Sequence, residues 1–394
     1  MLIGLVGKPS VGKSTFFKAC TLADVAIASY PFTTIKPNHG VGYVKIECID
    51  KEFNVQCQPR TGYCAKHKRF VPVELMDVAG LVKGASEGRG LGNQFLDDLR
   101  QADAFIHIVD ASGETDSEGK ETKGYNPVSD IDMLENELDL WYTGILQKVW
   151  KSFARTVQNT KENFAKAVAK QFSGLKVNEE DVKSVLLKLN YDAEKPADWT
   201  NEQLRKFCNE LRHLTKPMII AANKIDKPAA KENIERLKKA YPNIMIVPCS
   251  ADAELALREA NKAGLIEYMP GESEFEVLKQ LNEKQRQALD VIKKNVIDAY
   301  GSTGVQDVLN RAVFELLKYI AVFPAGASKL ADSKGNILPD CFLVPSGTTA
   351  LDFAYRLHTD IGKGFINAVN AKTKQVVGKE YKLKHRDGIE IMTR

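Results

Sequence analysis

A short stretch near the start of the chain, GKPSVGKST at 7–15, constrains the fold more than any other part of the sequence. It follows the apolar run LIGLV at 2–6 and precedes FFKAC at 16–20, an order typical of a strand, a glycine-rich loop and a helix. The glycines, lysine and serine have the P-loop spacing G-x-x-x-x-G-K-[ST]. Such a loop directs backbone N–H groups and the positive end of a helix dipole toward phosphate. The stretch predicts phosphate binding in an α/β fold, with an incidental glycine-rich turn as the alternative.

Each part of this loop has an expected task. Lys13 is expected to contact the β- and γ-phosphates and to assist catalysis, and Ser14 to give an oxygen to Mg²⁺. The loop as a whole is expected to surround the nucleotide, which makes candidate binding residues of Gly7, Lys8, Pro9, Ser10, Val11, Gly12, Lys13, Ser14 and Thr15.

Length and composition limit the class of protein only broadly. A chain of 394 residues should form two or three domains, each with a core of its own. With 44% hydrophobic and 27% charged residues and a net charge of +4, the composition neither indicates nor excludes an RNA partner. The sequence has no run of eighteen apolar residues and no signal-peptide pattern before the first strand. We therefore expect a cytoplasmic protein without a membrane partner.

The cysteines do not form the pattern of a disulfide framework, because seven of them are scattered over a long chain. Two expected strands, at 41–50 and 69–76, enclose the segment CQPRTGYCAKHKR. Its Cys57, Cys64 and His67 could be three ligands of a zinc ion, with Cys48 as a fourth. The alternative is a turn between two strands with incidental or disulfide-forming thiols. Both interpretations stay open at this point.

Two further segments are typical of a nucleotide switch. A loop containing Thr33 and Thr34 follows the expected P-loop helix, where a threonine hydroxyl can close on Mg²⁺ and the γ-phosphate. The strand at 69–76 runs into Asp77, which can hold Mg²⁺ through water, and Gly80, whose N–H can approach the γ-phosphate. The next residue is Leu81, which cannot orient the attacking water as a glutamine would.

The base of the nucleotide is expected to meet two later strand ends. An apolar strand at 217–222 leads into Asn223, Lys224 and Asp226, and the strand at 244–248 leads into Ser250 and Ala251. A carboxylate at Asp226 can accept hydrogen bonds from N1–H and the exocyclic amine of guanine, whereas adenine has neither donor at that edge. These five residues are candidate nucleotide-binding residues, and the motif favours GTP and GDP over ATP.

Between the expected strand at 104–110 and the strand at 217–222, the composition changes to lysine-rich helical stretches such as 130–172, 179–189 and 202–214. About a hundred helical residues exceed a simple strand-helix-strand crossover, so we expect an inserted helical domain, for example a hairpin of long helices. Its lysines could face RNA or could be the solvated side of helices. The lysines considered are Lys148, Lys151, Lys161, Lys166 and Lys170.

The motifs GKPSVGKST, YPFTT, DVAG, NKID and the Ser-Ala pair occur in an order that resembles GTPases of the Obg superfamily. The segments YPFTTIKPN and DVAGLVKGASEGRGLGNQFLDDLRQAD are similar to Obg and YchF signatures, and the helical insert and tail most resemble the YchF branch in its archaeal form. The tail, 321–394, resembles a TGS domain, a small β-grasp module. The resemblance implies Thr34 rather than Thr33 as the Mg²⁺ ligand beside Ser14 and Asp77. It also implies Lys13, Thr34 and Gly80 as the catalytic residues.

The same resemblance implies partners, and the sequence departs from the family pattern at two positions. It implies contact with the ribosome or RNA through the insert and the tail, without DNA specificity; a regulatory lid is the alternative role of the tail. YchF relatives are similar to ATPases, and their base-binding motif lacks the final aspartate. This chain has Asp226 at that position, which favours GTP. The Obg pattern has asparagine where this loop has Ser10, which puts K⁺ stimulation in doubt. The basic residues noted in the tail are Lys363, Lys372, Lys374, Lys382, Lys384 and Arg386.

Together these features predict a P-loop G domain with a mostly parallel sheet and helices on both faces, an inserted helical domain and a C-terminal β-grasp domain. The expected divisions are 1–112 and 213–319 for the G domain, 113–212 for the insert and 320–394 for the tail. The expected function is slow Mg²⁺-dependent GTP hydrolysis as a switch on the ribosome or RNA. The alternatives are a YchF-like ATPase and an RNA-binding adaptor with little turnover.

Overall fold

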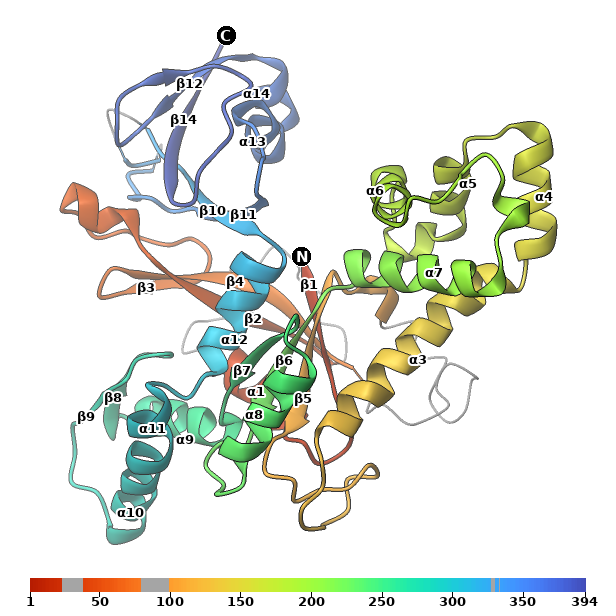
Figure 1. The fold of residues 1–394 in the computed structure, drawn as a ribbon. Coiled ribbons are helices and arrows are strands. Elements are labelled where there is room, and N and C mark those ends of the chain that lie inside the picture. The colour runs from red at the N-terminus through yellow and green to blue at the C-terminus, as the bar shows by residue number, and fades with distance from the viewer. Residues whose placement is uncertain (23–37, 79–98, 327–329, 333) are drawn as a thin grey trace. The chain divides into compact units, whose positions relative to one another are not determined.

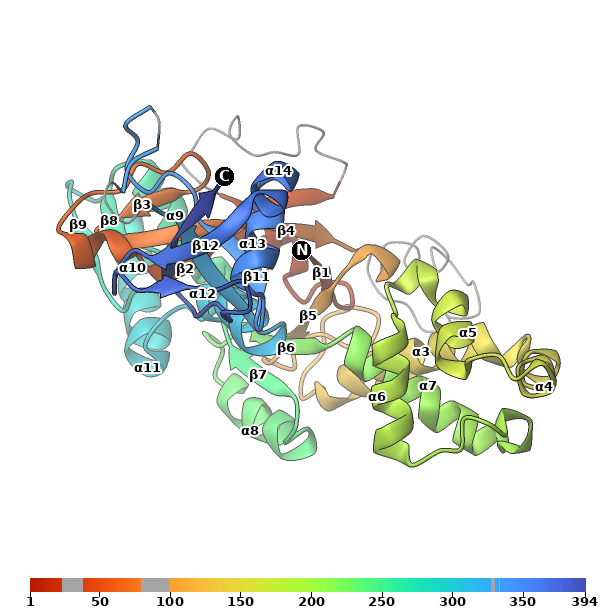
Figure 2. The same ribbon diagram turned by 90° about the horizontal axis from the view of Figure 1, so that it is seen from above.

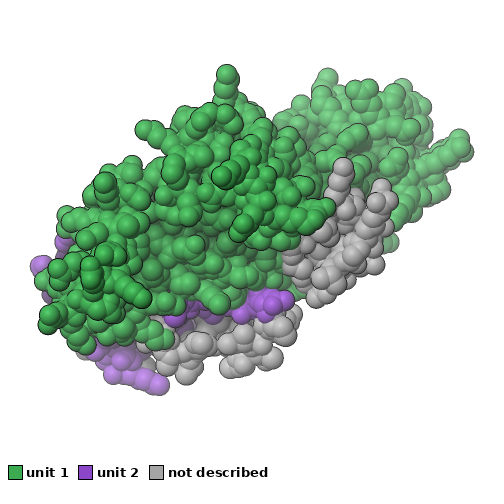
Figure 3. Space-filling view, turned by 90° about the horizontal axis from the view of Figure 1, so that it is seen from below, with its two compact units in different colours: residues 1–19, 74–308 green, residues 20–73, 309–394 purple. Residues whose placement is uncertain are grey.

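The computed structural model of the protein describes residues 1–22, 38–78, 99–326, 330–332 and 334–394. Two compact units make up the chain, and Figure 3 gives each its own colour. The first unit consists of Met1–Ala19 and Glu74–Val308, and the second of Cys20–Val73 and Leu309–Arg394. Each unit therefore combines two segments that lie far apart in the sequence.

A seven-stranded sheet carries the P-loop. Its strand order is β2-β4-β1-β5-β6-β7, with β3 paired to β4. β1 is parallel to β4 and β5, β5 to β6, and β6 to β7, so the carboxyl ends of these five strands meet at one edge. Every residue of β1, β5 and β6 is buried, as their continuous apolar runs predict for strands covered on both faces. The strands are β1 (Leu2–Val6), β2 (His39–Glu47), β3 (Tyr63–Ala65), β4 (Lys68–Asp77), β5 (Ala104–Asp110), β6 (Met218–Asn223) and β7 (Met245–Pro248).

Helices follow most of these strands, and a small hairpin of β8 and β9 follows α9. The parallel sheet with its connecting helices confirms the predicted α/β fold class. These elements are α1 (Lys13–Thr21), α8 (Ala230–Ala240), α9 (Ala251–Lys262), β8 (Ile266–Tyr268), β9 (Phe275–Val277), α10 (Glu283–Ile292), α11 (Asp298–Tyr300) and α12 (Val305–Arg311), with π-helical turns at Lys293–Ile297 and Ala312–Leu316.

The insert between β5 and β6 is a cluster of five helices and not a hairpin of long ones. In Figures 1 and 2 these helices gather into one group whose outer end, at α4, lies away from β1, β5 and β6. Buried aromatic side chains, among them Trp150, Phe164 and Phe207, form its core. The helices are α3 (Val128–Gln147), α4 (Trp150–Thr160), α5 (Phe164–Gln171), α6 (Glu179–Leu189) and α7 (Asn201–Thr215).

The C-terminal part of the second unit is a β-grasp fold. Its five-stranded sheet has the order β11-β10-β14-β12-β13, with β10 parallel to β14 and the other neighbours antiparallel. Phe353 of the main helix packs into a core with Val322 and Val344, which confirms the predicted domain type. The elements are β10 (Tyr319–Pro324), β11 (Phe342–Pro345), α13 (Ala350–Leu357), α14 (Thr359–Lys363), β12 (Phe365–Asn370), β13 (Val376–Val377) and β14 (Asp387–Thr393).

Two of the basic residues in this domain are already paired within the same unit. Lys372 and Arg386 both form ion pairs with Glu52, which lies in a 3₁₀ helix at Ile49–Phe53. Arg386 also donates to the carbonyl of Glu47 at 2.9 Å. These contacts connect the β-grasp domain with the segment after β2.

Among the described helices, none combines the length and the apolar character needed to cross a membrane.

Candidate nucleotide-binding site

The P-loop closely approaches its neighbours at two glycines. A Cβ atom on Gly7 would lie 2.6 Å from the carbonyl oxygen of Ile108 in β5. Gly12 has a φ of +91°, and a Cβ there would lie 2.4 Å from Nδ2 of Asn223. Because neither contact tolerates a side chain, both glycines are needed for the loop to approach Ile108 and Asn223 this closely and to begin α1 at Lys13.

Three residues predicted for phosphate and metal binding come together at the start of α1. Lys13 forms an ion pair with Asp77 at the carboxyl end of β4. The hydroxyl of Ser14 lies 3.3 Å from the other carboxylate oxygen of Asp77. A hydroxyl and a carboxylate are the hard oxygen ligands that Mg²⁺ prefers, so these residues fit the predicted ion. Thr34, Gly80 and Leu81 lie outside the described residues.

Asn223 connects the P-loop with the base-binding segment. Its amide Nδ2 donates to the carbonyl of Val11 at 2.8 Å, and its Oδ1 accepts from the backbone N–H of Ala251 at 2.9 Å. The side chain is 3% exposed, so both hydrogen bonds are sheltered from water. One buried amide thereby connects the P-loop with the start of α9.

Asp226 lies beside a pocket at the base end. The hydroxyl of Ser250 donates to its Oδ1 at 3.0 Å and also caps the first turn of α9 by accepting from Ala253. The backbone N–H of Ser250 bonds to the carbonyl of Thr303 at 2.8 Å. The pocket has a volume of about 560 Å³, and α10 supplies one of its walls. It is lined by Asp226, Ser250, Asp252, Ala253, Ala256, Lys284, Gln287, Ala288, Val291, Ile292 and Val296.

Lys224 forms an ion pair with Asp110. The sequence pattern identified Asp110 only as the last residue of an expected strand. The Nζ of Lys224 lies 2.8 Å from Oδ2 of Asp110. Burial alone would raise the pKa of Asp110, but hydrogen bonds from Lys224, Ser112 and Thr115 hold it below its usual value. The position of Asp110 at the end of the strand between the P-loop and the NKID motif is the signal in the sequence that could have identified this residue.

The side chain of Lys8 is occupied by contacts with the chain after β5. It is 2% exposed, donates to the carbonyl of Thr115 at 2.9 Å, and pairs with Asp130 of α3 at 2.9 Å. Its Nζ also lies 3.9 Å from the ring centre of Tyr125. Burial raises the pKa of Asp130 even though Lys8 opposes the shift. Any contact of Lys8 with a nucleotide is therefore expected from its backbone.

The remaining P-loop residues differ in exposure. Pro9 and Ser10 are exposed, and Ser10 has a φ of +63°. Val11 is fully buried, whereas Thr15 is partly buried in α1. Their predicted contacts with nucleotide stay predictions.

Comparison with known families matches three parts of the chain. Residues 2–137 match the family described as "50S ribosome-binding GTPase". Residues 221–326 match the Obg-like GTPase YGR210-like, G4 motif-containing domain, and residues 328–393 match the TGS domain.

Several known proteins are similar along nearly the whole chain. A GTP-binding protein of Methanocaldococcus jannaschii is 50% identical, with 100% of this chain and 99% of the relative covered. The ribosome-binding ATPase YchF of Bacillus subtilis is 30% identical over 93% of this chain and 87% of its own. The crystal structure of a GTP-binding protein from Pyrococcus horikoshii is 42% identical, covers both chains fully and gives a TM-score of 0.81.

Proposed function

Because the chain belongs to the Obg-like, YchF-type family of P-loop GTP-binding proteins with a TGS domain, we propose that it hydrolyses GTP slowly as a Mg²⁺-dependent switch. The observation that carries the proposal is Asp226, held by Ser250 beside a pocket that Asn223 connects to the P-loop. The switch is proposed to act on the ribosome or on RNA.

Guanine specificity follows from the hydrogen-bonding capacity of Asp226. A carboxylate accepts the two N–H donors of guanine, whereas adenine would leave it without them. The competing function is that of an ATPase, which is how the YchF protein of Bacillus subtilis and the Obg-like ATPase 1 of Homo sapiens are named. The two functions differ in the nucleotide that binds more tightly.

In the proposed reaction, the chain mainly positions the phosphates and neutralises their charge. Lys13 would neutralise the charge that develops on the oxygen between the β- and γ-phosphates. Ser14 and Asp77, with Thr34, would hold Mg²⁺, which neutralises phosphate charge when bound. Gly80 would offer its N–H to the γ-phosphate. Since Leu81 cannot align water, we expect unassisted turnover of about 10⁻⁴ to 10⁻² s⁻¹.

The decisive experiment is a side-by-side calorimetric titration of GTP, GDP and ATP with Mg²⁺. We expect guanine nucleotides to bind more tightly, and Asp226→Asn to lose about 2 kcal/mol or more of GTP affinity because an amide accepts at one atom only. The control is Asp252→Asn, an exposed carboxylate of the same pocket, which should change the affinity less than about 3-fold. Equal or tighter ATP binding by the wild-type protein would favour the ATPase.

The partner is proposed to bind through the helical insert and the β-grasp domain. All five lysines considered in the insert are exposed, as an RNA-facing surface requires. Single-turnover GTP hydrolysis with and without ribosomes tests this part. A faster reaction on ribosomes supports the switch, because a partner that prefers one state of the nucleotide loops shifts them toward it. Binding without any turnover would instead favour the RNA-binding adaptor.

A further inference from the structure

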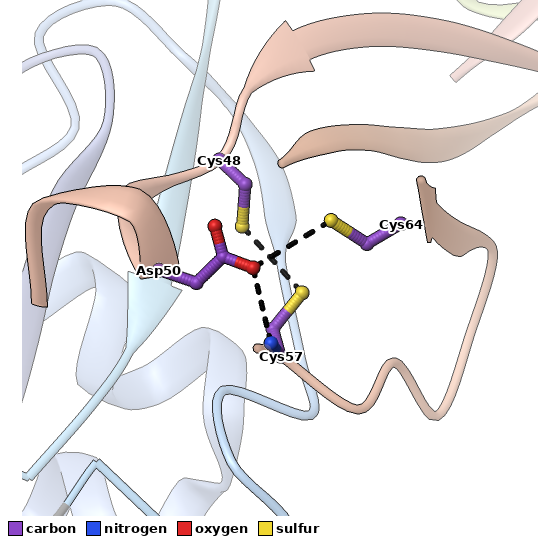
Figure 4. A group of neighbouring side chains, drawn as sticks. All are labelled: Cys48, Asp50, Cys57 and Cys64. Carbon is purple, nitrogen blue, oxygen red and sulfur yellow. Dashed lines mark hydrogen bonds between the residues drawn. The ribbon is translucent and has the colours of Figure 1, made fainter. Parts of the chain in front are cut away.

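Three cysteines and an aspartate converge in the second unit, outside the candidate nucleotide site. Cys48 directly follows β2, Asp50 lies in the 3₁₀ helix at Ile49–Phe53, Cys57 belongs to the loop after it, and Cys64 lies in β3. We call these four residues the thiol cluster. One ligand atom from each lies within 4.8 Å of the others, and Figure 4 shows the side chains directed toward a common centre.

Two separations in the thiol cluster match the edges of a tetrahedral metal site. With Zn–S bonds of about 2.3 Å, two sulfur ligands lie about 3.8 Å apart, and a sulfur and a carboxylate oxygen about 3.6 Å apart. Sγ of Cys48 lies 3.6 Å from Sγ of Cys57, and Sγ of Cys64 lies 3.7 Å from Oδ2 of Asp50. The four side chains are thus spaced for one small cation.

The surroundings orient Asp50 for such a role. The carboxylate is fully buried and accepts the backbone N–H of Cys57 at Oδ2, at 3.0 Å. Its Oδ1 lies 3.0 Å from Nδ1 of His67. The sequence pattern suggested His67 as a zinc ligand, but in the structure it contacts the carboxylate behind the cluster. Histidine–carboxylate contacts of this kind fix the orientation of metal ligands.

A buried cation from the protein compensates part of the charge. Three thiolates and a carboxylate would leave two negative charges on a site that holds a divalent ion. The guanidinium of Arg69, which is fully buried, lies 3.6 Å from Sγ of Cys57. Arg69 also donates to the carbonyls of Leu338 and Pro339 at 3.1 and 2.9 Å, which holds it beside the cluster.

We propose that the thiol cluster binds one Zn²⁺ in a structural site, with Cys48, Cys57, Cys64 and Asp50 as its four ligands. Thiolate ligands select zinc over the hard cations Mg²⁺ and Ca²⁺. Four protein ligands leave no open position for water or substrate, so the site holds the fold and does no chemistry. The three thiols release their protons as the ion binds.

The ion would add a further anchor to a loop that also contacts the chain before β11. The loop between the 3₁₀ helix and β3 donates backbone N–H groups from Gln58 and Arg60 to the carbonyls of Ile337 and Pro339, at 2.8 Å each. Zinc would therefore connect this loop with β2 and β3. The same loop is hydrogen-bonded to the segment before β11.

Metal analysis of the full-length protein, purified under reducing conditions without added metal, is the first test. We expect about one zinc per chain by inductively coupled plasma mass spectrometry. Cys48→Ser and Cys64→Ser should each lose most of it, whereas Cys208→Ser, a buried thiol of α7, should keep it. Zinc far below one per chain, or equal zinc in the three variants, overturns the proposal.

A second measurement does not depend on variants that fail to fold. Wild-type protein is stripped with a chelator and titrated with Co²⁺, which should give the intense visible bands of tetrahedral thiolate coordination with a 1:1 end point. His67→Ala should weaken the binding of Co²⁺ by about 10- to 100-fold with the same spectrum. Absence of these bands overturns the proposal, and so does a Cys48–Cys57 disulfide in freshly alkylated wild-type protein.

Discussion

Single residues in the candidate nucleotide site make contacts that exclude common substitutions. Asn223 donates to Val11 and accepts from Ala251, so it must carry both a donor and an acceptor. Aspartate would lose the donor and leucine would lose both. Since the residue is 3% exposed, water cannot replace either partner, and each buried group left without one costs about 1–3 kcal/mol.

We expect Asn223→Ala to weaken GTP binding by about 10- to 100-fold, equal to about 1.4–2.7 kcal/mol, because the P-loop and the base segment lose their common anchor. Calorimetric titration measures this affinity. The matched control is Asn233→Ala on α8, a buried asparagine that donates to the carbonyl of Ala111 at 2.9 Å. If both variants lose the same affinity, general destabilisation explains the effect.

Sequence alone could predict the residues of the site whose chemistry requires a fixed local pattern. Gly7, Gly12, Lys13 and Asp226 belong to short motifs, because phosphate and base contacts constrain neighbouring positions. The pocket wall from α10 could not be predicted, since apolar residues on a helix carry no sign of what they cover. The buried position of Lys8 depends on Asp130, 122 positions later, and such distant pairing leaves no local pattern.

At the scale of elements, an ion network around the buried Arg212 joins the two longest helices of the insert. Arg212 of α7 binds Glu135 of α3 at 3.0 and 2.6 Å and Asp139 at 3.0 Å. Nε2 of His213 lies 3.0 Å from the same Glu135. Burial would raise the pKa of Glu135, but His213 and Arg212 lower it to about 2. The hydrogen bond with Glu135 raises the pKa of His213.

These shifts have opposite consequences for stability. Glu135 has a depressed folded-state pKa, so its contribution is present above pH 4.5 and is lost as the pH falls toward about 2. His213 has a raised folded-state pKa, so its contribution is present below pH 6.5 and is lost as the pH rises through the folded value. The network as a whole is therefore most stabilising between about pH 4.5 and 6.5.

We predict that Glu135→Gln lowers the free energy of unfolding by about 2–3 kcal/mol at pH 7 and that this difference from wild type shrinks below pH 4.5. Urea unfolding at several pH values between 7 and 3 measures it. Glu232→Gln serves as the control, because its ion pair with Arg236 on α8 is exposed and should be worth less than about 1 kcal/mol. A difference that does not change with pH would contradict the role of Glu135.

The insert also shows where element prediction succeeds and fails. The helix at 179–189 has the predicted bounds, because Asn178 and Asp181 form a capping box that the local sequence specifies. The stretch 130–172 is three helices. Lys161 adopts a left-handed φ of +55° and Asn163 caps α5, so the chain turns back and Phe164 can reach the aromatic core. That demand comes from tertiary packing, which periodicity does not report.

On the scale of the whole molecule, the proposed ribosome or RNA partner would contact exposed lysines of the helical insert. We predict that replacing Lys151, Lys166 and Lys170 together by glutamate lowers ribosome affinity by at least about 10-fold, because phosphate contacts supply most of the binding energy. GTP affinity should stay the same, since these lysines are exposed on α4 and α5. Co-sedimentation with ribosomes measures the first quantity and calorimetry the second.

A charge-matched control separates this surface from net charge alone. Lys231, Lys239 and Lys262 are exposed on α8 and α9, and their triple glutamate variant has the same total charge. It should bind ribosomes as the wild type does. Equal losses in the two variants would show that the helical insert is not the contact surface.

The ion pairs of Glu52 limit how many counterions the β-grasp domain can displace from a nucleic acid. Of its basic residues, Lys372 and Arg386 already have a carboxylate partner in Glu52. Each contact with phosphate steepens the dependence of log K on log salt by about 0.7 to 0.9. While both ion pairs persist, Lys372 and Arg386 should therefore add little to this slope. A slope that becomes shallower by about 1.4 to 1.8 when both residues are replaced by glutamine would mean that RNA competes with Glu52 for these two cations.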